Sequence, residues 1–286
     1  MSNEGSTPDF VTFTRELENY KWYKPLLTII LGFIIYIILT LVISIIIEGA
    51  PGINRAALTS TGYESMNATS IEGLSQLLYV ITMIPSVWIA SKITRDRPFS
   101  TYLTSGRKWN WSIFLKTFLI GAIVILAIDI IPGIIQGTKI NIQFTIITFI
   151  MAIILVPLQC FAEELVFRGL FMQSFGSWFK IPIIAVILQA VLFMLGHPYN
   201  ILGQVSILAS GIAYGLIAWQ MNGLEATSGL HSANNLVLFL SMGLFAVGPI
   251  PTEVGLQAAL ADIAMVIVTA AITLGLYKKT NWLNPE

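Results

Sequence analysis

The sequence predicts an all-α protein, a polytopic transmembrane bundle of about eight helices. Hydrophobic residues make up 56% of the 286 residues and charged residues only 10%, whereas soluble domains carry about 25% charged residues. The mean hydropathy of the chain is +0.80. Because a folded soluble domain of about 300 residues still leaves about a quarter of its surface in water, a chain this apolar requires the lipid bilayer as its solvent.

The membrane helices are marked by apolar runs that are long enough to cross about 30 Å of hydrocarbon. The first four runs lie near residues 25–48, 74–93, 112–134 and 145–168. The next four lie near residues 181–198, 204–221, 227–247 and 258–277. Polar or turn-rich segments separate the runs. We therefore predict a cytoplasmic N-terminal segment at 1–24, a single membrane domain at 25–279 and a cytoplasmic tail at 280–286.

The distribution of basic residues predicts the orientation of the bundle. With eight spans, thirteen lysines and arginines fall on the side of the N-terminus, and only Arg55 and Lys139 fall on the opposite side. Loops rich in Lys and Arg stay in the cytoplasm. We therefore expect an integral, multi-pass protein of the cell membrane with both termini in the cytoplasm.

Three ionisable residues stand at the end of the fourth apolar run. Glu164 and Arg168 are spaced i and i+4, so a helix lets them pair. Glu163 lies about 100° further round the helix, so its carboxylate is left free for acid–base chemistry. The other interpretation of this segment is a charged helix end at the cytoplasmic surface.

Both histidines of the chain fall in late apolar segments. A single buried histidine is usually a hydrogen-bonded core residue, but His197 and His231 accompany an unpaired glutamate, which favours a functional site. His231 and Asn235 are spaced i and i+4 and are expected to face one cavity. Glu225, at the start of the seventh run, is interpreted as an acidic residue favoured by the helix dipole.

The order of these residues resembles a known family. A Glu-Glu-x-x-x-Arg segment, a Phe-x-x-x-His segment and a His-x-x-x-Asn segment follow one another on successive late helices. This order resembles the CPBP family of intramembrane proteases, which includes the CAAX prenyl endopeptidases and the Abi proteins linked to bacteriocin processing and self-immunity. The resemblance covers about residues 145–245, and each polar position of the pattern is filled. The first three runs resemble nothing specific.

The resemblance implies an endopeptidase that acts on a membrane-associated or lipidated peptide or protein. It implies that Glu163 activates the attacking water and that His197 helps to position or deprotonate it. His231 and Asn235 would stabilise the oxyanion, and Glu164 and Arg168 would support the site. Glu163 and His197 reach the same depth if the fourth helix continues to about Ser177, near the middle of the membrane.

A metal ion is the open part of this prediction. If zinc is the cofactor, the resemblance implies Glu163, His197 and His231 as its ligands, as in metalloproteases. The chain has no His-Glu-x-x-His motif, and its single cysteine allows no thiolate cluster. We favour the version without metal, because His231 and Asn235 make a sensible oxyanion pair.

Two other classes of function fit parts of the pattern. Glutamate, histidine and arginine within membrane helices also build the relays of proton-coupled transporters, although the inverted repeats typical of such proteins are not evident. A non-catalytic bacteriocin-immunity or peptide-binding membrane protein would keep the fold without turnover. In each case we expect the lipid bilayer and a membrane-associated peptide or protein as partners, and no nucleic acid.

Overall fold

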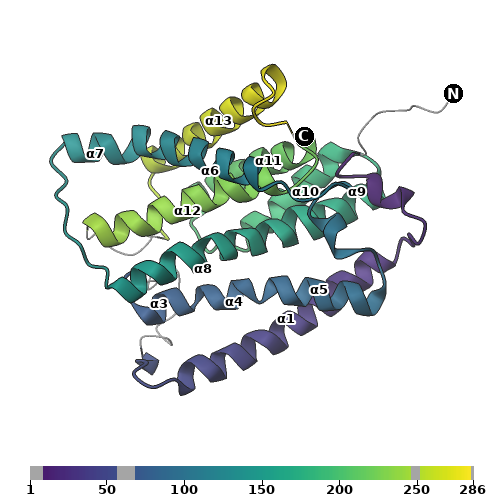
Figure 1. Cartoon of the computed structure of the whole chain (residues 1–286), viewed down its shortest axis with the longest axis horizontal. Helices are drawn as coiled ribbons and strands as arrows, with labels where there is room; N and C mark the ends of the chain where they lie inside the picture. Colours follow the sequence, from purple (N-terminus) through teal and green to yellow (C-terminus); the bar gives the residue numbers. More distant parts are fainter. Residues whose placement is uncertain (1–8, 57–67, 246–251, 285–286) are drawn as a thin grey trace.

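The computed structural model describes residues 9–56, 68–245 and 252–284, and across them the chain is helical (Figure 1). The ends of the predicted terminal segments, at 1–8 and 285–286, lie outside the described residues. So do the last two residues of the run predicted at 227–247. The only β-type pairing among the described residues is an isolated bridge between Thr104 and Gly223.

Residues 24–179 form four long helical segments. Three of them are broken or switch between α-helical and π-helical geometry along their length. The first is a single helix, α1 (Lys24–Gly49). The second is broken into α3 (Ile71–Ser75), α4 (Leu77–Ile81) and α5 (Met83–Thr94). The third joins α6 (Trp111–Ile125), the π-helical η4 (Leu126–Ile130) and α7 (Ile131–Ile135). The fourth joins α8 (Ile146–Glu164), the π-helical η5 (Leu165–Met172) and α9 (Gln173–Phe179).

The second half adds four uninterrupted helices. They are α10 (Pro182–Leu195), α11 (Ile201–Gln220), α12 (Glu225–Phe245) and α13 (Leu256–Lys279). Short 3-10 turns, η1 (Phe13–Glu16) and η3 (Phe99–Tyr102), lie in the connections. The described residues therefore contain the predicted eight long helical segments.

Six of these segments, counted over the described residues, are long and apolar enough to cross a membrane. Of the other two, α10 has only 14 residues. The prediction for this run, 181–198, was too long at its end. Pro198 disfavours helical geometry at the residue before it, so α10 stops at Leu195 and leaves His197 in the following turn. The remaining helix, α12, carries the polar residues His231, Asn234 and Asn235.

The surface of the bundle is apolar where lipid is expected. Helix α1 buries few of its side chains and exposes Ile30, Phe33, Ile38 and Ile45, with Ile45 72% exposed. Soluble monomers rarely expose contiguous apolar patches of this kind. Together with the six apolar helices, this surface identifies a multi-pass membrane protein.

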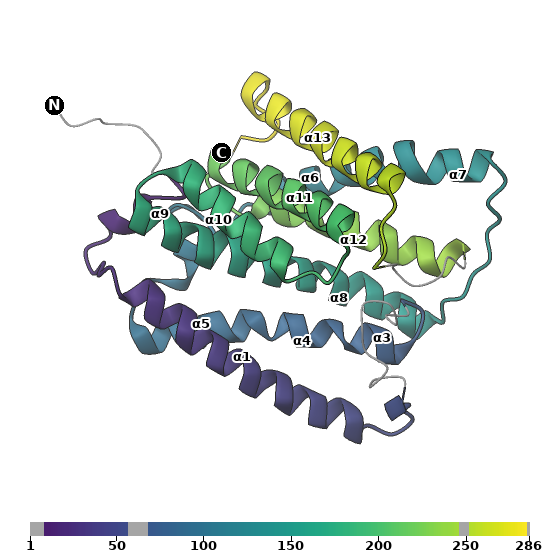
Figure 2. The same ribbon diagram turned by 180° about the vertical axis from the view of Figure 1, so that it is seen from behind.

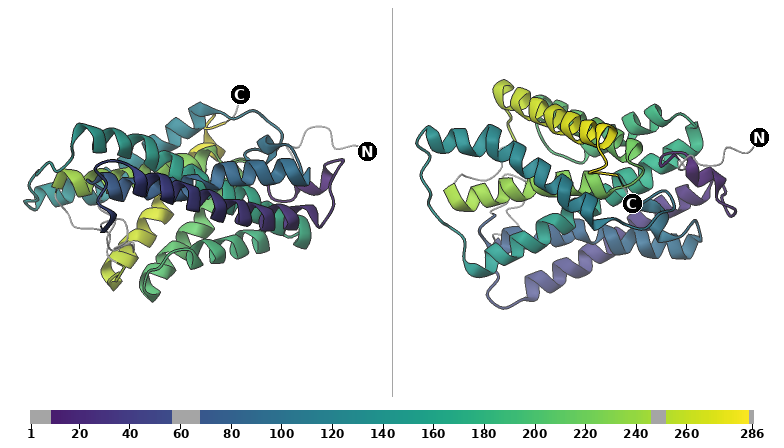
Figure 3. Two further views of the ribbon diagram at one scale, coloured as in Figure 1. Left: turned by 90° about the horizontal axis from the view of Figure 1, so that it is seen from below. Right: turned by 45° about the horizontal axis from the view of Figure 1, so that its top comes forward.

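The helices run side by side with α8 and α12 in the interior (Figure 1). Helix α1 lies along one edge of the bundle and α13 along the opposite edge, as the reverse view also shows (Figure 2). Seen from below, α11 and α13 slope away from the other helices (Figure 3). Helix α12 packs against both α6 and α8, which places its polar first turns beside Glu163 and Glu164.

Both ends of the chain meet at one end of the bundle. Phe10 and Val11 are fully buried in a cluster with residues of α10 and α11, and the Trp219 Nε1 donates to Asp9 Oδ2 over 3.1 Å. Leu283 is buried in a cluster with Ile113 and Met221. We call this the basic end. It comprises residues 9–13, Leu283, the 95–110 connection and the 221–224 turn.

Candidate functional site

The fourth helical segment carries the two glutamates near the middle of its length. The helix is longer than the run predicted at 145–168, and the condition that it continue to about Ser177 is met, since helical geometry runs from Ile146 to Phe179. Glu163 and Glu164 form the last residues of α8, directly before the π-helical η5. A π-helical turn widens the helix and is frequent at functional sites. The glutamates therefore lie inside the bundle, not at a charged helix end at the surface.

Glu164 is the centre of a buried network. Its Oε1 accepts from Arg168 Nη1 over 3.0 Å and from His231 Nδ1 over 2.9 Å. The Glu164 and Arg168 side chains are both fully buried. The predicted i, i+4 pairing is thereby confirmed. The guanidinium also lies 4.4 Å from the ring centre of Phe193 and 5.7 Å from that of Tyr214, within cation–π range.

Glu163 is held differently from its neighbour. It is buried, and its Oε2 lies 3.5 Å from His231 Nε2. Among the residues that the structure describes, no group donates a hydrogen bond to this oxygen. A buried carboxylate oxygen is costly unless it is hydrogen-bonded. Glu163 Oε2 is therefore a hydrogen-bond acceptor that still lacks a donor.

Asn235 lies one helical turn beyond His231, as the spacing predicts. Its Nδ2 lies 3.4 Å from His231 Nε2 and donates to Gln159 Oε1 over 3.2 Å. Its Oδ1 accepts from the Nδ2 of Asn234 over 3.0 Å. The amide is therefore oriented from both sides, with its nitrogen towards the imidazole.

Sequence reasoning missed two residues of this network. Gln159 stands one helical turn before Glu163 in the same apolar run, and a polar residue at that position was a usable signal. Tyr214 has a ring centre 5.8 Å from that of His231. It comes from α11, so no short spacing in the sequence links the two. Cys160, the single cysteine, is buried and donates from Sγ to the His231 carbonyl over 3.5 Å.

His197 borders the site but does not join the direct contacts around Glu164. Its Nδ1 lies 2.8 Å from the carbonyl oxygen of Phe193, and its ring centre lies 4.6 Å from that of Phe193, with the two planes tilted by 60°. The Phe193 ring also meets His231 edge-on at 6.1 Å. Tyr199 stacks on His197 at 6.2 Å. Burial raises the pKa of Tyr199 to about 12, and the charges of Asp262 and Glu163 add to the rise.

The residues do not fit the three-ligand zinc site that the resemblance suggests. Glu163 Oε2 and His231 Nε2 lie 3.5 Å apart, and the Phe193 ring contacts both imidazoles. Within 9–56, 68–245 and 252–284, no three His, Cys, Asp or Glu side chains gather in an arrangement that could hold a metal ion. A catalytic zinc needs about three protein ligands and one open position. The described residues therefore supply too few ligands for a catalytic zinc.

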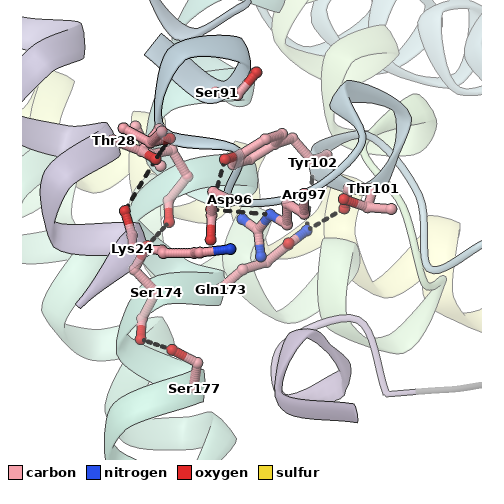
Figure 4. Close-up of polar contacts among 12 residues, drawn as sticks. Lys24, Thr28, Ser91, Asp96, Arg97, Thr101, Tyr102, Gln173, Ser174 and Ser177 are labelled. Atoms are coloured by element: carbon pink, nitrogen blue, oxygen red, sulfur yellow. Dashed lines mark hydrogen bonds and ion pairs between the residues drawn. The ribbon is translucent and has the colours of Figure 1, made fainter. Parts of the chain in front are cut away.

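A second buried network braces the fourth helical segment from the basic end (Figure 4). Arg97 Nη2 donates to the carbonyl of Gly169, a residue of η5, over 3.3 Å. The Tyr102 hydroxyl donates to Asp96 over 2.8 Å, and Arg97 stacks 3.9 Å above the Tyr102 ring. A Cβ on Gly169 would lie 2.7 Å from the Tyr102 carbonyl oxygen, so only glycine permits this approach. These contacts fix η5 directly after Arg168.

The comparisons with known proteins agree with this arrangement. Residues 143–237 match the family described as type II CAAX prenyl endopeptidase Rce1-like, and this range contains the whole polar network from Gln159 to Asn235. The chain is also 30% identical, over 227 residues, to the uncharacterized protein YyaK of Bacillus subtilis (strain 168). That alignment covers 72% of this chain and 76% of the relative. The chain therefore belongs to the Rce1-like family, which is the CPBP family.

Proposed function

We propose that this protein is an intramembrane endopeptidase that hydrolyses a peptide bond of a membrane-associated or lipidated peptide or protein. One observation carries the proposal. The buried Glu163 Oε2 receives no hydrogen bond from any described residue and faces His231 Nε2 at 3.5 Å. This oxygen is free to accept a proton from a water molecule, and the His231 imidazole beside it can contact the same water.

In the proposed reaction, Glu163 takes a proton from a water molecule while the oxygen of that water attacks the scissile carbonyl carbon. The carbonyl becomes a tetrahedral oxyanion. As the C–N bond breaks, the proton held by Glu163 passes to the leaving nitrogen. The products are a carboxylic acid and an amine, and Glu163 returns to its ionised form.

His231 and Asn235 are proposed to bind the oxyanion. Their Nε2 and Nδ2 atoms lie 3.4 Å apart, so both can reach one oxygen atom. The Glu164 carboxylate fixes the imidazole through Nδ1, and Gln159 fixes the amide. Groups that are oriented before the reaction stabilise developing charge without reorganising. We assign His197, whose ring contacts Phe193, to positioning the water or the substrate.

The test is a cleavage assay on the purified full chain in lipid nanodiscs. The substrates are membrane-anchored peptides with and without a prenylated cysteine, and mass spectrometry identifies the products. We expect cleavage by the wild type and a loss of at least about 10³-fold in Glu163→Gln, the range for removal of an essential acid–base group. The matched control is Glu48→Gln, since Glu48 is an exposed glutamate at the end of α1. It should retain full activity.

Two outcomes would contradict parts of this proposal. Unchanged cleavage by Glu163→Gln would remove Glu163 from the reaction. Loss of activity on exhaustive chelation, restored by stoichiometric zinc, would replace the metal-free mechanism and require a rearrangement that brings a third ligand to Glu163 and His231.

A further inference from the structure

An open cavity of about 400 Å³ lies at the basic end, in the connection that leads into α6. Its lining includes Ser100, Thr104, Arg107, Lys108 and Trp109. The volume falls within the range of small-molecule sites, about 300–1,000 Å³. None of these residues belongs to the network around Glu163.

The lining of the cavity is basic and contains no acidic residue. Arg107 is held in place by the buried Glu225, with Nη2 donating to Oε2 over 2.9 Å and a second contact from Nη1 to Oε1. Glu225 Oε1 also accepts from the backbone of Asn110 over 3.0 Å. Lys108 is exposed and forms no ion pair within the described part of the chain. One positive charge in the cavity therefore stays uncompensated, beside an arginine that is already oriented.

The surroundings of the cavity place it at the level of lipid head groups. Trp111 follows directly and is 66% exposed, and its ring contacts Trp109 edge-on at 5.8 Å. Nearby, Lys116 Nζ donates to the carbonyl of Trp282 over 2.7 Å. Exposed tryptophans mark the interface between hydrocarbon and water, and lysines beside them attract anionic lipids.

We propose that this cavity binds the phosphate of an anionic phospholipid head group. Lys108 supplies the uncompensated charge, Arg107 a fixed guanidinium, and the exposed Ser100 hydroxyl a hydrogen-bond donor. Basic pockets between membrane helices bind head groups in this way. A lipid fits better than a freely diffusing anion because Trp111, two residues after the lining residue Trp109, is exposed as expected of a tryptophan at the membrane interface.

Two lining residues of the cavity contact the helices that carry the candidate site. Trp109 packs edge-on against Phe161 at 5.6 Å, two residues before Glu163 on α8. Glu225, the partner of Arg107, is the first residue of α12, which also carries His231. The binding site is nevertheless measurable without any turnover, so its test does not depend on the proposed protease activity.

The test is a titration of the purified full chain in a neutral detergent, followed by native mass spectrometry. The probes are dihexanoyl phosphatidylglycerol, dihexanoyl phosphatidylcholine and inorganic phosphate. We expect one phosphatidylglycerol to bind saturably and about tenfold more tightly than phosphatidylcholine, consistent with contacts to more than one basic residue. Lys108→Gln should weaken phosphatidylglycerol binding about fivefold, the effect of one lysine near a membrane surface. Lys108→Glu should weaken it further.

The matched control is Lys21→Gln, since Lys21 is an exposed lysine at the same end but outside the cavity. It should bind phosphatidylglycerol like the wild type, and thermal unfolding should confirm that all variants fold. Equal binding of the two lipids, or equal binding by wild type and Lys108→Gln, would overturn the proposed site. Displacement of phosphatidylglycerol by an equal concentration of inorganic phosphate would overturn the assignment to a lipid.

Discussion

The adjacent residues Glu163 and Glu164 have different surroundings although they are chemically identical. One oxygen of Glu164 receives hydrogen bonds from both Arg168 and His231, and all three side chains are buried. Glu163 Oε2 receives none from the described residues. Glu164 is therefore needed to hold a buried arginine and an imidazole in place, whereas Glu163 contributes little to the packing.

The two glutamates should differ most clearly in stability. Glu164→Gln leaves the Arg168 charge buried without a counter-ion, which costs about 3–5 kcal/mol. Glu163→Gln breaks no hydrogen bond to Oε2 and should change the free energy of unfolding by less than about 1 kcal/mol. Thermal unfolding of the purified variants in detergent measures the difference. Equal losses of stability in the two variants would contradict the assignment of Glu164 as the supporting residue.

Asn235 should affect turnover more than substrate binding. Removing one donor of an oxyanion site lowers kcat by about 10²–10³-fold, and we expect this loss in Asn235→Ala. KM should change little, because the contact strengthens only in the transition state. Steady-state kinetics on a cleaved peptide separates the two parameters. Asn19→Ala is the control, since Asn19 is an exposed asparagine outside the network around Glu164. A raised KM with unchanged kcat in Asn235→Ala would identify a role in binding instead.

At the scale of elements, glycines set how closely α12 approaches α6. A Cβ on Gly229 would lie 2.3 Å from Thr117 Oγ1 and 2.4 Å from the Phe114 carbonyl oxygen. One turn of α12 further along, a Cβ on Gly121 of α6 would lie 2.9 Å from that of Ala233. Small residues at such positions let membrane helices approach closely. His231 lies between these two contacts, so the packing of α12 on α6 fixes its depth.

Gly229→Ala should therefore push α12 away from α6. Overpacking costs about 1–3 kcal/mol, and we expect a Tm lowered by several degrees, roughly 2–4 °C per kcal/mol. Gly275→Ala on α13 is the matched control, because a Cβ there meets no atom within 4 Å. It should leave Tm unchanged. An equal Tm for both variants would show that α12 can move away from α6 without loss of stability.

The sequence predicts the bounds of a helix well where hydropathy and residue spacing determine them. It predicts poorly the features that depend on contacts between helices. The apolar run at 25–48 closely matches α1, Lys24–Gly49. The π-helical turns of η4 and η5 were not predicted, because widening a helix by one residue leaves its composition unchanged. The early end of α10 was readable from Pro198.

The same distinction applies to the candidate site. The pairing of Glu164 with Arg168 lies within one helix and follows from the i, i+4 spacing. The contact of Glu164 with His231 spans 67 residues and was not predicted, although the family resemblance placed both residues at one site. Glu225 was expected to act through the helix dipole, but its partner is Arg107, 118 residues away. Local geometry is encoded in spacing, whereas such contacts depend on how the helices pack.

For the whole molecule, the main constraint on topology is that the first and the last described residues lie at the basic end. Asp9 and Phe10 contact Trp219 and Asn222. Leu283 packs in a cluster that includes Met221. The two ends of the chain therefore meet the same turn, which requires an even number of crossings between them.

Topology mapping tests this constraint and the direction of insertion. Reporter fusions to the N-terminus and the C-terminus should give the same signal, and the bias of basic residues predicts that both are cytoplasmic. A fusion in the segment after α7, near Lys139, should report the opposite side. Opposite signals from the two termini would mean an odd number of crossings and would invert part of the bundle.

The burial of Phe10 and Val11 also has a consequence for biosynthesis. These residues pack in a cluster with Met172, Ala185 and Leu224, which a ribosome adds roughly 160 to 210 residues later. At about 5–20 residues per second, this delay is roughly 10 to 40 s. During that time two apolar side chains have no final partner, while successive helices enter the membrane. The beginning of the chain is thus among the last parts to reach its place.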